Sequence, residues 1–483
     1  MKNTFIRIIA IILTLCTVVA LFVGCNGENE ENSTTSAPAE QETTDEVFPE
    51  VSRNNYNKEL YLSILPDVNP FDCYWVEEAG NNNLSDAIYN RQEKVRDYLG
   101  VEIVATKTDN ENRYITPFQT AVKNKDGSVD VLISHVYYGI DGFIMGNYLT
   151  DFRDIDEIDL EADYWKLGFM EEIAAKDHLY LGFSDFNILY THVVTFNKQL
   201  MDKYAHELDN DVYSLVQDYK WTVDQMISLA SLVYVDANSD GKSEDDTFGF
   251  ATRYSIGYAG MLQGCNIQLV EQDEKGNYTL AVYNDKNKQK MSALVDKLYD
   301  FVRSESAYFT VDKSSANIGS GRVLMSISGT FSLSELLETD VEFGVLPYPM
   351  YDEMQKDVGY RSLQWGGYIC VPTYLEDAKM VGESLEMISY FSDDVNIAFY
   401  EKLLGKQVAD APLDRVMLDI VWDGVCSDLG QTYYAVIRNN TTKYLYVIEM
   451  LTKEGTTYNL ASYMATVESS ANKNLKKFFA QIK

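Results

Sequence analysis

The chain has 483 residues, with 74 acidic and 40 basic side chains, and its formal net charge at pH 7 is −34. This length exceeds what one hydrophobic core supports and predicts several domains, while the negative charge argues against nucleic acid or an anionic membrane surface as a partner. Tyrosine is abundant, at 35 residues against 5 tryptophans, and rings with a polar tip suit the binding of sugars or peptides.

The N-terminus has the features of an export signal. Lys2 and Arg7 precede a nearly unbroken apolar run, residues 8–23, which ends at Gly24 and Cys25. A small residue before a cysteine, followed by a polar stretch, resembles the processing site of bacterial lipoproteins. This resemblance implies that Cys25 carries a lipid, becomes the mature N-terminus and anchors the protein at the extracellular face of the cell membrane. A plain cleaved signal peptide is the alternative.

The segment that follows is predicted to be a linker. Residues 25–56 are acidic and rich in Asn, Glu, Ser and Thr, a composition that buries too little apolar surface to order the chain. As a coil, the segment would reach roughly 30 Å. We therefore expect a disordered tether between the anchor and the folded part.

From residue 58 on, the sequence alternates between strand and helix patterns. Strands are expected at 58–65, 101–105 and 129–133, and helices at 84–99 and 114–125. This β-α-β-α-β order predicts a parallel sheet in a doubly wound α/β lobe. His135, Tyr137 and Tyr138 directly follow the third strand, at the carboxyl edge where such sheets present ligand sites. A purely structural role for His135 is the alternative.

A further strand–turn–helix–strand unit is predicted at residues 322–349. A buried strand at 323–327 ends in a small-residue turn that includes Thr330, and Phe331 follows. Ser332 and Glu335 have the spacing of a capping box, which predicts a helix before the next strand, 341–346. Phe331 would then present its ring at the rim of a ligand site; the alternative is that Phe331 is an ordinary core residue.

Earlier in the chain, residues 179–185 and 192–198 are expected to be paired strands, and Thr222 is expected to cap a helix.

Five segments, taken in order, resemble the extracellular solute-binding proteins of bacterial ABC importers, in the family that includes maltose- and oligosaccharide-binding proteins. These segments are DVLIS (130–134), FNKQLMDKY (196–204), KWTVDQM (220–226), SISGTF with FGVLPYP (326–331 and 343–349) and VPTYLEDAKMVGESLEMISYFS (371–392). The resemblance covers nearly all of residues 58–483. It implies an α/β, two-lobe periplasmic-binding-protein-like fold of type II, with the ligand in the cleft between the lobes.

The resemblance also implies how the chain is divided and what it does. Residues 1–24 are the signal peptide, 25–56 the linker, 57–186 and 365–400 the first lobe, and 187–364 and 401–483 the second. The chain would be a monomeric receptor that closes by a hinge around a small ligand, with a carbohydrate expected, and hands it to an ABC permease. A peptide-binding receptor of the same fold and a glycan-adhesion protein without a permease are the alternatives.

The expected ligand-binding residues combine the family's positions with the local sequence. The family's contacts map onto His135, Tyr137, Tyr138 and Phe331, although sugar binders often carry Trp at the last position. Trp365 stands beside two glycines that permit close approach of a ligand to the backbone. The full expected set is His135, Tyr137, Tyr138, Asp185, Thr330, Phe331, Trp365 and Trp422.

Residues 236–247 follow the pattern of an EF-hand-type calcium loop. Asp, Asn and Asp occupy positions 1, 3 and 5, and Gly occupies position 6, but position 12 is Thr247 instead of Glu. The predicted ligands are Asp236, Asn238, Asp240, Lys242 and Asp246. An ordinary Asx-rich turn before a strand is the alternative. Calcium would be structural here, because the resemblance places this loop away from the cleft, and no cofactor is required.

The sequence contains no nucleophile elbow, zinc-protease, P-loop or dinucleotide motif, and no carboxylate pair stands out as a glycosidase dyad. The four histidines show no metal spacing. Four cysteines of the exported part are far apart, so one disulfide and four buried thiols both stay open: Cys73, Cys265, Cys370 and Cys426. A binding protein is therefore expected, and no enzyme.

Overall fold

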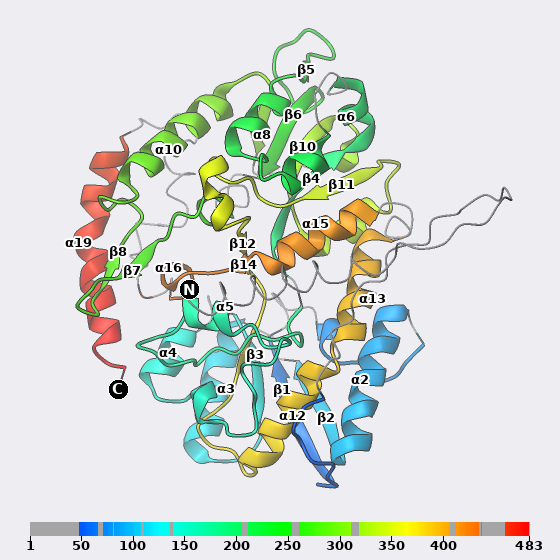
Figure 1. The fold of residues 1–483 in the computed structure, drawn as a ribbon, viewed down its shortest axis with the longest axis vertical. Coiled ribbons are helices and arrows are strands. Elements are labelled where there is room, and N and C mark those ends of the chain that lie inside the picture. The colour runs from blue at the N-terminus through cyan, green and yellow to red at the C-terminus, as the bar shows by residue number, and fades with distance from the viewer. Residues whose placement is uncertain are drawn as a thin grey trace, which may run out of the picture. The chain divides into compact units, whose positions relative to one another are not determined.

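Two β-sheets organise the chain in the computed structural model (Figure 1). The structure describes residues 48–65, 71–80, 82–107, 111–135, 139–188, 190–204, 211–253, 260–310, 318–405, 412–433, 436 and 459–482. We call each sheet, with the helices that pack on it, a lobe. The α/β fold class and the two-lobe organisation expected from the sequence are confirmed.

The first lobe is built on a four-stranded sheet in the order β13-β3-β1-β2. The strands are β1 (Lys58–Ile64), β2 (Val101–Lys107), β3 (Val131–Ser134) and β13 (Tyr368–Cys370). The first three are parallel and β13 is antiparallel to β3. The crossovers are helices α2 (Asn83–Leu99) and α3 (Glu111–Asn124), so the predicted β-α-β-α-β unit is confirmed. Gly100 ends α2 at a φ of 66°, a left-handed conformation that glycine adopts without strain.

The chain already packs against α2 before β1 begins. The backbone N–H groups of Asn54 and Tyr56 donate to the carbonyls of Tyr98 and Leu99, and the Tyr98 hydroxyl donates to the Val51 carbonyl at 2.8 Å. Residues 49–56, which the sequence assigned to the linker, therefore have a defined place on the first lobe. The earlier part of the linker and the signal segment with Cys25 lie outside the described residues.

The second lobe is built on a six-stranded sheet whose path is β11-β4-β10-β6-β5, with β9 paired to β6. The strands are β4 (His192–Asn197), β5 (Tyr234–Val235), β6 (Thr247–Arg253), β9 (Ala307–Thr310), β10 (Val323–Gly329) and β11 (Phe343–Leu346). β10 lies in the middle, antiparallel to β4 and parallel to β6, and nearly all of its residues are buried. The predicted buried strand is thus confirmed and extends to Gly329.

Two local predictions are wrong. Residues 179–185 do not pair with β4; they form only isolated bridges, Gly182 with Ile369 and Ser184 with Trp165. Ser332 does not cap a helix by its side chain, because its backbone is itself helical, at φ −81° and ψ −7°, whereas a capping side chain needs an extended backbone. A 3₁₀ turn, Thr330–Ser332, runs directly into the single turn of α11 (Leu333–Leu336).

The segment after β11 is hydrogen-bonded to the residues at the start of α8 (Val223–Ala230). The buried indole of Trp221 donates to the Pro347 carbonyl at 2.9 Å, and Met350 exchanges backbone hydrogen bonds with Trp221 and Val223. Thr222 accepts a hydrogen bond from the Gln225 N–H, which confirms it as the N-cap. Two of the segments quoted from the sequence, KWTVDQM and FGVLPYP, therefore meet in one contact.

The chain crosses between the lobes more than once. It leaves the first sheet after β3, enters the second at β4 and returns at β13. Helices α12 (Ala378–Tyr390) and α13 (Asp393–Leu404) then pack against α2, and α15 (Pro412–Asp423) packs against β11 of the second sheet. A small parallel sheet of β12 (Ser362–Leu363) and β14 (Val425–Cys426) joins two of these passages (Figure 1). Helix α19 (Leu460–Phe479) packs on the hairpin of β7 (Val270–Gln272) and β8 (Tyr278–Leu280).

Several tyrosine hydroxyls donate hydrogen bonds to other groups within the protein. The hydroxyls of Tyr56, Tyr164 and Tyr213 donate to carboxylates, and those of Tyr360 and Tyr433 donate to backbone carbonyls. Part of the tyrosine content is thereby explained by the architecture. The four cysteines at positions 73, 265, 370 and 426 are free and buried, so the alternative of four thiols holds.

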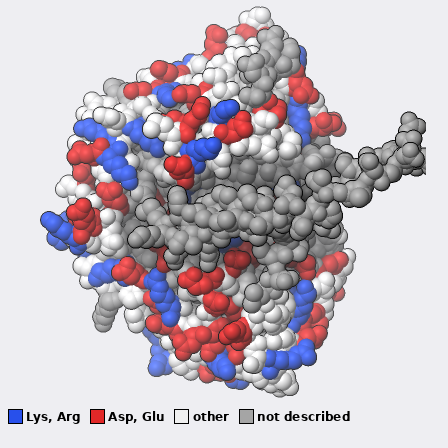
Figure 2. All heavy atoms as spheres, in the orientation of Figure 1, with Lys and Arg blue, Asp and Glu red and all other residues white. Residues whose placement is uncertain are grey.

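On the face shown in Figure 2, basic side chains are interspersed among acidic ones and do not gather in one patch. Across the described ranges, no helix combines the length and the apolar character that crossing a membrane requires.

Candidate ligand-binding site

The end of β3 and the return connection meet at His135. Its side chain is buried and makes a hydrogen bond to the backbone of Trp365, so two predicted site residues are in contact. Burial lowers the pKa of His135 to about 4, and the imidazole is therefore neutral at pH 7. Tyr137 and Tyr138 lie outside the described residues.

Two of the connections between the lobes, the one before β4 and the one before β13, are hydrogen-bonded to one another. The Trp365 N–H donates to the Tyr190 carbonyl at 2.7 Å, and the Thr191 hydroxyl donates to the Leu363 carbonyl at 2.5 Å. Thr330, at the end of β10, joins the same junction: its N–H donates to the Thr191 carbonyl at 2.9 Å, and its hydroxyl accepts from the Thr191 N–H. Thr330 is fully buried and holds the junction together.

Aromatic rings line this junction. Phe331 is half-buried and meets Tyr190 edge to face, with ring centroids 4.7 Å apart, and meets Phe399 of α13 at 5.5 Å. His192 meets Trp365 edge to face at 5.5 Å. Burial, with a further contribution from the Arg253 charge, lowers the pKa of His192 to about 4. The junction thus combines aromatic faces with neutral polar groups.

Tyr190 and His192 are members of this site that sequence reasoning missed. They stand at the beginning of a predicted strand, whereas the rule applied to the sequence looks for ligand groups at strand ends. β4 runs antiparallel to β10, so its first residue, His192, pairs with Gly329, the last residue of β10. The direction of β4 is what brings its beginning to the site, and a sequence does not display that direction.

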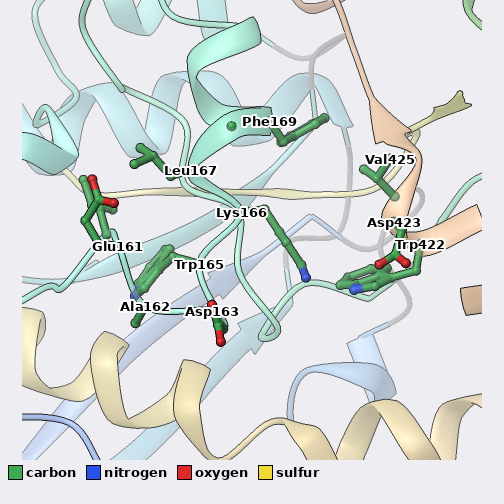
Figure 3. Close-up of a pocket in the computed structure, with 12 residues that line it drawn as sticks. Glu161, Ala162, Asp163, Trp165, Lys166, Leu167, Phe169, Trp422, Asp423 and Val425 are labelled. Carbon is green, nitrogen blue, oxygen red and sulfur yellow. The ribbon is translucent and has the colours of Figure 1, made fainter. Parts of the chain in front are cut away.

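A cavity of about 330 Å³ adjoins residues 160–169 and the end of α15 (Figure 3). Its wall includes Trp165, Lys166 and Phe169 from the chain that packs on the first lobe, and Trp422 and Asp423 from α15. Because α15 packs on β11, the cavity is lined from both lobes. Its volume is in the range of small-molecule sites.

Two more predicted residues, Asp185 and Trp422, are grouped around Lys166. Figure 3 shows the Lys166 side chain extending toward the indole of Trp422; the ammonium lies 5.4 Å from the ring centroid. It also lies 3.9 Å from Asp185 Oδ1. Trp422 is half-buried and packs against Phe183 with centroids 5.9 Å apart. An indole face beside a charged pair is thus presented to the cavity.

The other tryptophan of the cavity is held rigidly. The Trp165 indole N–H donates to Glu386 Oε2 at 2.8 Å, and the Tyr164 hydroxyl donates to Oε1 of the same carboxylate at 2.5 Å. Glu386 is buried, and burial raises its pKa. A fixed ring pre-organises the wall of the cavity and reduces the entropy lost on binding.

Helix α13 contacts both the residues of the junction and the residues beside the cavity. Phe399 contacts Phe331 at the junction, while the next residue, Tyr400, is electrostatically coupled to Asp185 and Asp423 beside the cavity. Burial raises the pKa of Tyr400, and the carboxylates of Asp419, Asp185 and Asp423 add to the effect. His135, Thr330, Phe331 and Trp365 therefore form one group, Asp185 and Trp422 form a second, and α13 touches both.

The acidic loop folds onto its own backbone. Asp236 accepts three hydrogen bonds from N–H groups of the loop, at 2.7 to 3.4 Å, and Asp246 accepts two, at 2.9 and 3.0 Å. Asn238 and Asp240 bond to one another at 2.9 Å, and the Lys242 ammonium donates to the Ser304 carbonyl. Nowhere in the described ranges do three His, Cys, Asp or Glu side chains converge as a metal site would require. Calcium binding by this loop stays a prediction.

No protein-family model matches the sequence, and no curated protein matches it. Among solved structures, the chain is similar to the GacH receptor of Streptomyces glaucescens, which has been solved unliganded and in complex with acarbose and an acarbose homolog. The match has a TM-score of 0.51 and 15% sequence identity, and it covers 88% of this chain and 99% of the receptor. At this identity the similarity establishes a shared two-lobe α/β fold.

Proposed function

We propose that this chain is a membrane-anchored, extracellular solute-binding receptor that captures a carbohydrate by hinge closure and delivers it to an ABC permease. The observation that carries the proposal is the meeting of aromatic rings and polar groups from both lobes where the lobes are joined. Phe331, Tyr190 and Trp365 lie at the paired connections, and Trp422 with Lys166 lies at the cavity. A saccharide offers apolar ring faces and many hydroxyls, which are the groups such a lining binds.

Two further facts support a sugar as the ligand. The receptor with the similar fold was solved with acarbose, and the ordered sequence segments resemble those of oligosaccharide-binding proteins. The permease and the lipid at Cys25 rest on that sequence resemblance and on the N-terminal signal. The absence of catalytic motifs from the sequence is consistent with a receptor that releases its ligand unchanged.

The paired connections provide a physical basis for closure. In this proposal the Tyr190–Trp365 and Thr191–Leu363 hydrogen bonds, with those of Thr330, persist while the lobes rotate about them. A ligand that contacts both lobes binds the closed state more tightly than the open one, and this difference in affinity drives the closure.

The test is a binding screen on the chain from residue 26, which lacks the proposed lipidation site Cys25. Maltotriose, cellotriose, xylotriose and acarbose are titrated by calorimetry, with a tetrapeptide mixture as the competing class. We expect one saccharide to bind and to decrease the radius of gyration measured by X-ray scattering. Binding of peptides in place of saccharides, or of no compound in either class, would contradict the proposal. The titration is repeated with the Trp422→Ala variant to test whether the cavity takes part in binding. This substitution removes an indole from the cavity wall without truncating a fully buried residue.

A further inference from the structure

Gln364 lies within the return connection, between the two residues that bond to the other connection. Leu363 accepts from Thr191 and Trp365 donates to Tyr190, while the backbone N–H of Gln364 donates to the Cys426 carbonyl at 3.0 Å. The residue is fully buried. Within the described part of the chain, neither Oε1 nor Nε2 of its side-chain amide has a hydrogen-bond partner.

The chain makes room for this amide beside the aromatic rings. Gly366 has no side chain, and a Cβ there would lie 2.6 Å from Gln364 Nε2 and 3.0 Å from the Cβ of Tyr190. The amide therefore occupies the space next to Tyr190, whose half-buried ring contacts Phe331. An alanine at position 366 would push the amide away from this place.

Such an amide is unusual in a folded protein. Roughly 90% or more of buried polar groups have a partner, because removal from water without a replacement bond costs free energy. Three neighbours of the junction share the property among the described residues: Ser134 Oγ at the end of β3, His192 Nδ1 at the start of β4 and Ser362 Oγ just before Leu363. They come from different strands and connections near Trp365: Gln364 precedes Trp365, His192 contacts it, and Ser134 precedes His135, which is hydrogen-bonded to its backbone.

These groups are also uncharged. Glutamine and serine carry no charge; burial keeps His135 neutral at pH 7, and burial together with the charge of Arg253 keeps His192 neutral. A buried neutral layer of donors and acceptors is suited to a neutral partner that both donates and accepts. A hydroxyl group does so, whereas a carboxylate only accepts and an ammonium only donates.

We propose that Gln364 is a ligand-recognition residue, whose amide donates to and accepts from neighbouring hydroxyls of a neutral saccharide placed against Tyr190 and Phe331. This inference rests on the proposed function and adds the residue that selects hydroxyl groups. The ligand would reach the amide as the lobes rotate apart about the paired connections, and His192 Nδ1 would supply a further acceptor or donor according to its tautomer.

The experiment compares two buried glutamines. Gln364→Met keeps the length of the side chain and removes the amide. Gln355→Met is the control, because its amide is satisfied: Nε2 donates to the Gly264 and Gly359 carbonyls, and Oε1 accepts from the Tyr351 N–H. Melting temperature without ligand and affinity for whichever of maltotriose, cellotriose, xylotriose or acarbose binds wild type are measured for both variants.

Opposite results are expected for the two variants. Gln364→Met should melt at or above the wild-type temperature, because no internal bond is lost, and should bind the saccharide about 10-fold or more weakly. Gln355→Met should melt lower and keep its affinity. A monodeoxy series of the bound saccharide then identifies the hydroxyl: its removal should weaken binding to wild type but not to Gln364→Met.

Other outcomes overturn the inference. Unchanged affinity of Gln364→Met would show that the amide holds internal water and does not touch the ligand. A melting temperature lowered as much as in Gln355→Met would show that the amide is satisfied within the protein. If no saccharide binds wild type, the proposed function itself fails and the inference fails with it, a result distinct from the other two.

Discussion

The carboxylate of Asp414 accepts a hydrogen bond from the backbone N–H of Val345 at 3.0 Å and thereby fastens the first turn of α15 to strand β11. The same buried carboxylate accepts from the Tyr213 hydroxyl at 2.7 Å and pairs with the Lys198 ammonium at 2.9 Å. Three partners from three elements thus converge on one side chain. Since Trp422 lies near the opposite end of α15, this anchor also determines where the indole stands at the cavity.

Replacing Asp414 by alanine should therefore affect stability and binding together. Removing one partner of a buried ion pair costs about 3–5 kcal/mol of unfolding free energy, because the remaining groups stay buried without a partner. We expect a loss of this size in urea denaturation, with weaker saccharide binding as α15 shifts. Asp419→Ala is the control, since this carboxylate is exposed on the same helix, and it should change stability by well under about 1 kcal/mol. Equal effects of the two substitutions would contradict the anchoring role.

The two neutral histidines predict a loss of stability in mild acid. Burial lowers the pKa of both His135 and His192 to about 4, whereas an unfolded histidine has a pKa near 6.5. As the pH falls below about 6.5, the unfolded chain takes up protons that the folded chain does not, so stability is complete above that pH and declines toward pH 4. Each imidazole should cost about 1.4 kcal/mol at pH 5.5.

The measurement compares unfolding free energies at pH 7.5 and 5.5 for wild type, His135→Gln and His192→Gln. Each substitution removes one titrating group, so the difference between the two pH values should shrink by about 1.4 kcal/mol in each variant, whatever its stability at pH 7.5. A pH difference that stays the same in both variants would show that other groups cause the acid sensitivity.

Much of the fold was predictable, because local pattern and packing agree there. The apolar run of β10 and the amphipathic α2 with Gly100 at its end each point to one structure, and both were confirmed. The capping box failed because Ser332 follows a 3₁₀ turn, and a helical backbone at that residue cannot be recognised from the spacing of Ser332 and Glu335.

The site was only partly predictable, for a different reason. Phe331 and Trp365 could be singled out because a turn or glycines adjoin them in the sequence. Tyr190, His192 and Gln364 owe their place to the antiparallel course of β4 and to the pairing of two connections more than 170 residues apart (Thr191 with Leu363, 172 residues). Contacts of such sequence separation arise from tertiary packing, which local propensity does not encode.

The acidic loop can be tested by one substitution at each of two positions. Hydrogen bonds from backbone N–H groups lower the pKa of Asp246, and the bond from Ala237 contributes most. The Asp246→Ala variant should therefore have a lower melting temperature with or without calcium. The calcium prediction adds a separate effect: in chelator-stripped protein, 1 mM calcium chloride should raise the melting temperature of wild type but not of Asp240→Ala. No response of wild type to calcium would leave the loop as an Asx turn closed by its own backbone.

The proposed lipid anchor can be tested by substituting Cys25. If Cys25 carries lipid, Cys25→Ser should leave the precursor unprocessed or release the chain from the membrane fraction, as judged by mass spectrometry and fractionation. Cys73→Ser is the matched control, because this thiol is buried in the folded part and should not affect fractionation. Mature, membrane-bound Cys25→Ser protein would contradict lipidation.

Phe331→Ala decides whether the ring is a ligand contact or part of the core. The half-buried ring makes edge contacts with Tyr190 and Phe399, and each such aromatic pair contributes about 0.5–1.5 kcal/mol. We therefore expect a stability loss of about 1–3 kcal/mol, smaller than the 3–5 kcal/mol expected on the same scale for Phe399→Ala, because the Phe399 side chain is almost fully buried. If a saccharide lies against Phe331, loss of that contact should cost about 2 kcal/mol of binding, or roughly 30-fold in affinity. Urea denaturation and calorimetry on the two variants separate these contributions. A Phe331→Ala variant that binds normally, yet is as destabilised as Phe399→Ala, would place the ring in the core and leave Tyr190, Trp365 and Trp422 as the aromatic contacts of the ligand.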